Sequence, residues 1–197
     1  MAQQQPKKIS SELASSAPEF RKFRNIYKTH ELPDAHKSLD GKFTSYSTLK
    51  YLPDEEKALK LLRTLACIVQ PVMSHHKIVA HALHERIYDG ECDIIAINYV
   101  RKDDQGTYIR SADTGLYTSI VLSITLRRHK DPSKFYTLEE LLDILCHELA
   151  HCWHVGHKFN FHLQWASLVV WSGKLKMTLV GSCKLSVRIV ILMSKGD

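Results

Sequence analysis

The segment from about Leu138 to Val155 carries the clearest helical pattern in the chain. Thr137 is followed three residues later by Glu140, a capping-box pattern that marks the start of a helix. Apolar side chains then recur every three or four residues and form one stripe: Leu138, Leu141, Leu142, Leu145, Leu149 and Cys152. At about 100° per residue, His147 and His151 fall roughly opposite this stripe. The pattern predicts a helix that packs on a core and presents two histidines on its other face.

Residues 147–151 read His-Glu-Leu-Ala-His, which is an HExxH pattern. Residues four apart lie on one face of a helix, so His147 and His151 can both reach one zinc ion. Glu148 sits beside the first ligand, where its carboxylate can take a proton from a water that zinc activates. The pattern favours a zinc metalloprotease with Glu148 as its catalytic acid/base. The alternative is a helix with surface histidines, since HExxH also arises by chance.

A third ligand has to be a downstream histidine. No glutamate follows Glu148, and the only later aspartate is the terminal Asp197. Three histidines follow the motif closely: His154, His157 and His162. His154 continues the helical face of His147 but lies ~10 Å further along the axis of a regular helix. That separation is too large for both rings to bind one ion.

Gly156 favours His157 as the third ligand. A glycine tolerates the positive φ of a helix terminus, and a helix that ends there can turn back towards the metal. We therefore predict a zinc site formed by His147, His151 and His157, with His162 less favoured and His154 beside the site or on the surface.

The rest of the chain predicts a mixed α and β domain. A helix is expected at about Asp54–Met73, kinked or ended by Pro71, and another at about Lys158–Val170. Strands are expected at Lys77–Leu83, Ile94–Tyr99 and Thr118–Leu126, with a long hairpin loop over Arg101–Tyr117. The second of these strands reads as buried and the third as buried on one face. We expect the third strand to border the cleft, where it could pair with an extended peptide.

Domain boundaries follow from the same pattern. Residues 1–45 mix Gln, Ser, Lys and Pro without a period and predict a flexible leader. Residues 46–172 form the predicted metalloprotease domain, and residues 173–197 form a basic C-terminal tail.

Composition restricts the setting of the protein. No apolar run approaches the ~18 residues of a membrane helix, and no secretory signal precedes the domain, so we expect an intracellular protein without a membrane partner. The five cysteines are irregularly spaced and predict reduced thiols. The net charge of +6 is compatible with nucleic acid. The candidate DNA contacts are a basic cluster: Arg127, Arg128, Lys130 and Lys134.

Three blocks of the chain resemble the WLM family, zinc metalloproteases linked to SUMO and ubiquitin and implicated in the repair of DNA–protein crosslinks. They are the helix from Ala58 to Met73, the strand Ile94–Tyr99, and the segment from Ile124 through HExxH to Phe161. The resemblance implies an α+β, zincin-like fold in which a small twisted sheet packs on helices, including the HExxH helix. It also implies Zn²⁺ as cofactor, His147, His151 and His157 as ligands, and Glu148 as catalytic residue.

The resemblance further implies protein substrates, DNA as a partner, SUMO or ubiquitin as possible partners, and a nuclear location. The chain departs from the family at Lys158, where an aspartate usually follows the third histidine. Ile189–Leu192 is apolar like a SUMO-interacting motif, but its basic flanks favour a plain strand. Two alternatives stay open: a WLM-like module that binds DNA or a modifier and cuts poorly, and a zinc peptidase unrelated to DNA.

Overall fold

The computed structural model describes residues 26–31, 43–86 and 95–180, without the side chains of Glu31 and of residues 174–180. Three helices are present in these ranges: α3 (Glu55–His76), α4 (Leu138–Ala150) and α5 (Phe159–Val180). The strands are β1 (Tyr27–Glu31), β2 (Ser45–Leu49), β3 (Ala80–Glu85), β4 (Ala96–Val100), β5 (Ser119–Ile124), β6 (Arg127–Arg128) and β7 (Asp131–Phe135). None of the helices in the described ranges combines the length and apolarity needed to span a membrane.

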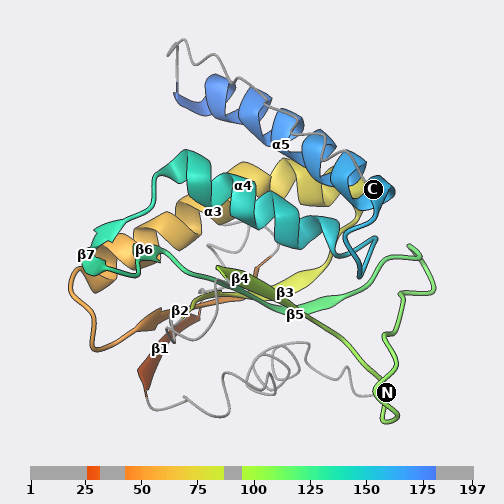
Figure 1. Cartoon of the computed structure of the whole chain (residues 1–197), viewed down its shortest axis with the longest axis horizontal. Coiled ribbons are helices and arrows are strands. Elements are labelled where there is room, and N and C mark those ends of the chain that lie inside the picture. Colours follow the sequence, from red (N-terminus) through yellow and green to blue (C-terminus); the bar gives the residue numbers. More distant parts are fainter. Residues whose placement is uncertain (1–25, 32–42, 87–94, 181–197) are drawn as a thin grey trace, which may run out of the picture.

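Five strands form one mixed sheet in the order β1-β2-β3-β5-β4. The inner pairs β2–β3 and β3–β5 are parallel, whereas the outer pairs β1–β2 and β4–β5 are antiparallel. A separate two-stranded ribbon is formed by β6 and β7. The helices lie on one side of the large sheet, with α4 between the sheet and α5 (Figure 1). The predicted α+β architecture, in which a small sheet packs on helices including the HExxH helix, is therefore confirmed.

Two apolar clusters hold the sheet. The main core fills the space between the helices and the sheet, and includes the buried face of α4. A small second cluster consists of Tyr27, Leu49, Ala82 and Val121. Because Val121 and Leu122 of β5 belong to different clusters, β5 is buried on both faces. The prediction of a single buried face for this strand was wrong.

The edge of the sheet beside α4 is β4, not β5. β5 pairs with β3 on one side and with β4 on the other, so no edge of β5 is open to a peptide. The expectation that Thr118–Leu126 pairs with substrate is therefore corrected. β4 itself is half-buried along its length and Ile95 is exposed, which also corrects the prediction that Ile94–Ile97 is buried. Ile94 lies outside the described residues.

The helices differ from prediction at their ends. α3 continues through Pro71 to His76, because the proline ring faces solvent while Val72 and Met73 are buried in the core. α4 ends at Ala150, earlier than Val155, and α5 runs beyond Val170 to Val180.

Part of the predicted leader belongs to the folded domain. Residues 27–31 form the edge strand β1, paired with β2, and Phe43 is buried in the main core. The flexible-leader prediction is therefore wrong for these residues. The first eight residues of the predicted tail, 173–180, continue α5. The remainder of the tail, including Ile189–Leu192, lies outside the described residues.

Candidate metal centre

The start and the rotation of α4 set the direction of its histidines. The Thr137 hydroxyl accepts a hydrogen bond from the Glu140 amide at 3.3 Å, and the Glu140 carboxylate accepts one from the Thr137 amide at 2.8 Å. The predicted capping box is thus confirmed. The apolar stripe lies in the core, with Leu141, Leu145 and Leu149 fully buried. The remaining face of α4, which carries the two motif histidines, points away from this contact.

A tight turn follows α4 and carries the chain to the third histidine. Successive backbone bonds of 3.0–3.3 Å join His151, Cys152 and Trp153 to carbonyls three residues earlier. Gly156 does not have the positive φ that the sequence interpretation assigned to it. The chain turns at residues 151–156, and α5 begins immediately afterwards at Phe159. The reversal was predicted, but its position and backbone geometry were not.

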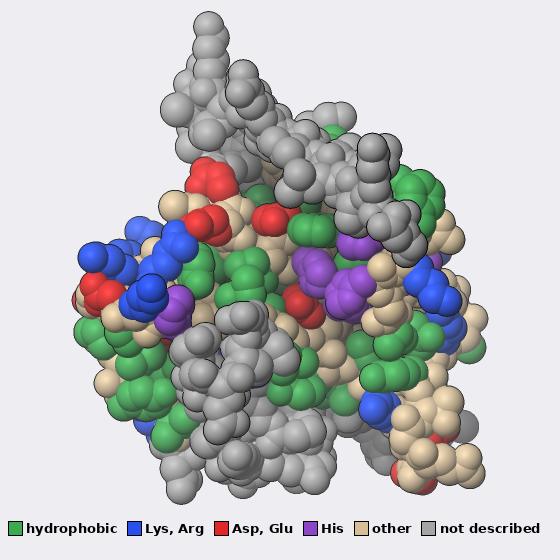
Figure 2. Space-filling model, in the orientation of Figure 1, with side chains coloured by type: hydrophobic (Ala, Val, Ile, Leu, Met, Phe, Trp, Pro, Cys, Tyr) green, Lys and Arg blue, Asp and Glu red, His purple; other side chains and the backbone are tan. Residues whose placement is uncertain are grey.

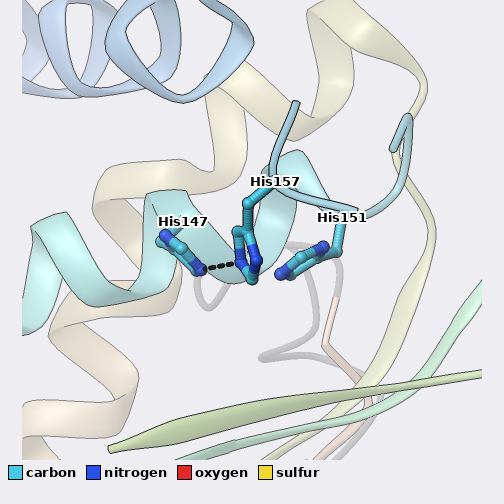
Figure 3. Close-up of side chains that lie close together, drawn as sticks. All are labelled: His147, His151 and His157. Atoms are coloured by element: carbon cyan, nitrogen blue, oxygen red, sulfur yellow. Dashed lines mark hydrogen bonds between the residues drawn. The ribbon is translucent and has the colours of Figure 1, made fainter. Parts of the chain in front are cut away.

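His147, His151 and His157 converge on one point (Figure 3). Each offers one ring nitrogen, and these atoms all lie within 4.8 Å of one another. The Nε2 atoms of His147 and His157 are 3.0 Å apart. Two nitrogens bound tetrahedrally to one zinc at ~2.0–2.1 Å would be about 3.4 Å apart, so small movements suffice to accommodate the ion. The donor set fits zinc, and neither His154 nor His162 belongs to this cluster.

His154 acts on the site through its backbone. Its carbonyl accepts a hydrogen bond of 2.8 Å from Nδ1 of His151. That bond fixes the tautomer of His151 and leaves its Nε2 free for a metal, the usual arrangement around ligating histidines. Among the described residues, no comparable acceptor holds Nδ1 of His157, and the following Lys158 is exposed.

The turn after α4 is also held from the hairpin between β4 and β5. The amide of Tyr117 donates to the carbonyl of Cys152 at 2.8 Å, and the Arg110 guanidinium donates to the carbonyl of Trp153 at 3.2 Å. The backbone carbonyls of Cys152, Trp153 and His154, three successive residues of the turn, therefore each accept a hydrogen bond. Sequence reasoning identified the hairpin but missed this role, because no motif connects residues so far apart in the chain.

Aromatic side chains of α5 pack against the histidines. The ring centroid of the buried Phe161 lies 4.8 Å from that of His147. The ring centroid of Trp165 lies 5.0 Å from that of His147. The Trp165 indole donates to the backbone and side-chain oxygens of Asp143 on α4. These contacts hold the His157 segment and α5 against the motif helix.

Burial favours neutral histidines in the cluster. It lowers the pKa of His147 to about 4, with further lowering by the neighbouring His151 and His157. Burial also lowers the pKa of His151. Neutral imidazole is the form that binds a metal, so these two side chains need no deprotonation at neutral pH.

Glu148, the residue after His147 on α4, is buried, with 6% of its surface exposed. Burial raises the pKa of its carboxyl to about 7, while a hydrogen bond from the Asn98 amide and the positive charge of Arg86 act in the opposite direction. A carboxyl group that titrates near neutrality can both accept and return a proton. In the space-filling view, histidine side chains reach the surface near the middle of one face, with acidic side chains beside them (Figure 2).

The four candidate DNA contacts fall in different environments. Arg127 is 4% exposed, and its guanidinium pairs with the buried Glu85 at 2.6 Å. It cannot reach a phosphate, which corrects its assignment. Arg128 is ion-paired with Glu140. Lys130 is exposed, and Lys134 is exposed while pairing with Asp131 at 3.3 Å.

The cysteines near the motif are packing residues. Cys146 and Cys152 are buried, and burial raises the pKa of each thiol to about 12. Both are free thiols, as is the half-buried Cys67. Cys92 and Cys183 lie outside the described residues.

Comparisons with known proteins bear on the family and the fold of the chain. The model of the WLM domain family matches residues 41–184. Two solved structures of Wss1 from Saccharomyces cerevisiae, one of them a mutant, are similar at TM-scores of 0.58 and 0.55 with 17% and 19% identity. The similarity covers 73% and 76% of this chain and 99% and 96% of those chains, and at such identity it shows a shared fold. No curated protein matches the chain.

Proposed function

Since the chain belongs to the WLM domain family, we propose that it is a zinc-dependent endopeptidase. His147, His151 and His157 are the proposed zinc ligands, and Glu148 is the proposed catalytic acid/base. The observation that carries this proposal is the convergence of three ring nitrogens, two of them from the helix that also carries the buried Glu148.

The residues of the site divide the chemistry between them. A zinc ion held by the three histidines would supply Lewis acidity towards a peptide carbonyl and a water molecule. Glu148 takes a proton from the attacking water and returns it to the nitrogen of the departing amine. Burial raises the pKa of its carboxyl, the direction that favours uptake of a proton. His154 and the β4–β5 hairpin keep the ligand turn in place through its carbonyls.

The strand nearest the catalytic glutamate suggests how substrate binds. β4 is an edge strand, and it lies beside Glu148 through Asn98. An extended peptide could add to this edge by main-chain hydrogen bonds. The proposed substrates are therefore proteins with an accessible extended segment.

We further propose that the substrates are proteins crosslinked to DNA or modified by SUMO or ubiquitin, that DNA stimulates cleavage, and that the protein acts in the nucleus. The family resemblance and the net charge of +6 support this proposal. Lysine and arginine side chains gather at the left end of the histidine-bearing face, where β6 and β7 lie (Figure 2). Lys130 and Lys134 are the exposed candidates there.

Glu148→Gln tests the catalytic assignment. The substitution removes the proton acceptor but keeps the size of the side chain, so proteolysis should be lost while bound zinc and the unfolding temperature stay near wild type. Bound zinc is measured by elemental analysis. Proteolysis is followed on a gel, both with a generic protein substrate and as self-cleavage. Activity near wild type, or loss of zinc, would contradict the assignment.

Lys130→Glu combined with Lys134→Glu tests the DNA proposal. Phosphate contacts release counterions, so loss of both lysines should weaken DNA binding and reduce the slope of log affinity against log salt by about 2. DNA-stimulated cleavage should fall, while cleavage without DNA stays unchanged. Lys50→Glu, an exposed lysine before α3, is the matched control.

The outcomes separate the proposal from its alternatives. Binding of DNA without cleavage by the zinc-loaded wild type would favour a WLM-like binding module, the reading that Lys158 supports. If the protein cleaves its substrate but does not bind DNA, and DNA does not stimulate cleavage, a zinc peptidase unrelated to DNA is favoured.

A further inference from the structure

Asn98 of β4 interacts with both the backbone carbonyl and the side-chain carboxylate of Glu148. Its side-chain amide donates a hydrogen bond of 2.8 Å to the backbone carbonyl of Glu148. Its backbone amide also interacts with the Glu148 carboxylate and acts to lower the pKa of that group. One residue of β4 thus binds both the main chain and the reactive group of a residue on α4, fifty positions away.

The strand geometry explains why the backbone amide is available. Ile95 accepts a hydrogen bond from Thr125, so the pairing of β4 with β5 uses the backbone groups of alternate residues, beginning with Ile95. Asn98 is opposite Leu122 and falls between these positions, so its N–H points to the edge that β5 does not occupy. The Asn98 N–H that interacts with the Glu148 carboxylate is therefore on the edge of β4 that no other described strand occupies.

The side-chain amide has only one orientation that fits. The NH₂ group can donate to a carbonyl, whereas the opposite rotation would place Oδ1 against the Glu148 oxygen. The same NH₂ group is 3.9 Å from the sulfur of Cys152, a much weaker contact. Among the described residues, Oδ1 of Asn98 has no partner. The contribution of this side chain is therefore concentrated in its NH₂ group.

We propose that Asn98 is a positioning residue that holds Glu148 in its reactive orientation through the paired contacts with its carbonyl and carboxylate. The inference rests on the proposed function, in which Glu148 moves the proton. The Glu148 carbonyl also accepts from the His151 amide at 3.3 Å. Anchoring that carbonyl therefore steadies the last turn of α4, between two of the histidines.

Asn98→Leu and Asn98→Asp test this role. Leucine has similar volume but no donor, and aspartate keeps the shape but replaces the NH₂ donor by a negatively charged oxygen. Both substitutions should lower kcat about 10- to 100-fold, the range for residues that hydrogen-bond to the groups of a metal site without binding the metal. KM, zinc content and unfolding temperature should stay close to wild type. In a Glu148→Gln background, Asn98→Leu should cause no further loss, because the two residues act as one unit.

Cys152→Ala is the matched control, because it removes the other neighbour of the same NH₂ group and should leave kcat near wild type. A second measurement is independent of catalysis: hydrogen exchange of the amides in 147–152, made on metal-free protein. Exchange there should be faster in Asn98→Leu than in Cys152→Ala.

The two readouts distinguish failure of the inference from failure of the proposed function. Unchanged kcat in Asn98→Leu, beside an active wild type and an inactive Glu148→Gln, would overturn the positioning role. So would loss of zinc or a change confined to KM. If the wild type does not cleave protein at all, the proposed function fails, and unchanged exchange in Asn98→Leu would then overturn the anchoring role as well.

Discussion

His154 and His157 lie three residues apart, yet they contact the candidate metal centre through different atoms. The His157 ring faces Nε2 of His147 at 3.0 Å. The His154 ring is outside the cluster, and its contribution is a backbone carbonyl that orients His151. A carbonyl is present in every amino acid, so the identity of residue 154 matters much less than that of residue 157.

This difference gives a prediction at the scale of single residues. His157→Ala removes a proposed ligand and should lose most bound zinc and all activity, because two histidines on adjacent turns do not complete a zinc site. His154→Ala keeps the carbonyl and should retain zinc and substantial activity. The two variants are purified side by side and their zinc stoichiometry is compared. Loss of metal from His154→Ala with retention in His157→Ala would contradict the assignment.

At the scale of elements, the first turn of α4 joins the motif helix to the β6–β7 ribbon. Glu140 closes the capping box and also binds Arg128, whose Nη2 is 2.7 Å from each carboxylate oxygen. The hydrogen bond from the Thr137 amide, followed by that from Arg128, lowers the pKa of Glu140. The ionised carboxylate is therefore favoured in the folded protein.

The sign of the pKa shift predicts a stability change with pH. A lowered pKa in the folded state contributes stability above the unfolded pKa, and this contribution disappears as the pH falls through the folded pKa. Glu140→Gln should therefore cost about 0.2–1 kcal/mol at pH 7, the range of an exposed ion pair, and progressively less below pH ~4. Denaturant unfolding across this pH range measures the difference. Glu56→Gln, which removes an exposed charge in the first turn of α3, should show a smaller pH-dependent difference.

At the scale of the whole molecule, a buried ion pair connects three parts of the fold. Glu85 at the end of β3 accepts from the Leu49 amide of β2 at 2.9 Å and pairs with Arg127 of β6. Arg127 also donates to the Pro132 carbonyl and lies over the Phe135 ring at 4.3 Å. The large sheet and the β6–β7 ribbon are thereby joined through charges that have little contact with water.

Removing one member of this pair should destabilise the protein more than removing both. Arg127→Leu leaves the Glu85 charge buried and unpaired, which should cost about 3–5 kcal/mol. Adding Glu85→Gln keeps an acceptor for Leu49 and removes that charge, so the double variant should recover part of the loss. Chemical denaturation of the two single variants and the double variant gives the coupling energy. Additive losses would show that the charges do not interact.

Local pattern was sufficient for the parts of this protein that depend on neighbouring residues. The spacing of apolar side chains predicted the helices containing Leu62 and Leu145, and the capping box predicted the start of α4. Ligand spacing predicted that His147, His151 and His157 meet, because two lie one helical turn apart and the third follows a short reversal. These relations are set within about ten residues of chain, where backbone geometry leaves few choices.

Contacts between distant segments decided the rest. Arg127 looked like a surface cation, but its partner Glu85 is 42 residues away, and only the packing of β6 on the sheet buries it. β4 is the edge strand among the described residues because the strand order places β5 between β3 and β4. The motif predicted that Glu148 would be near zinc, but its burial and its contact with Asn98 depend on how α4 docks against β4. The sequence by itself therefore determined which groups could carry out the chemistry, whereas tertiary packing determined the solvation and hydrogen bonding on which their reactivity depends.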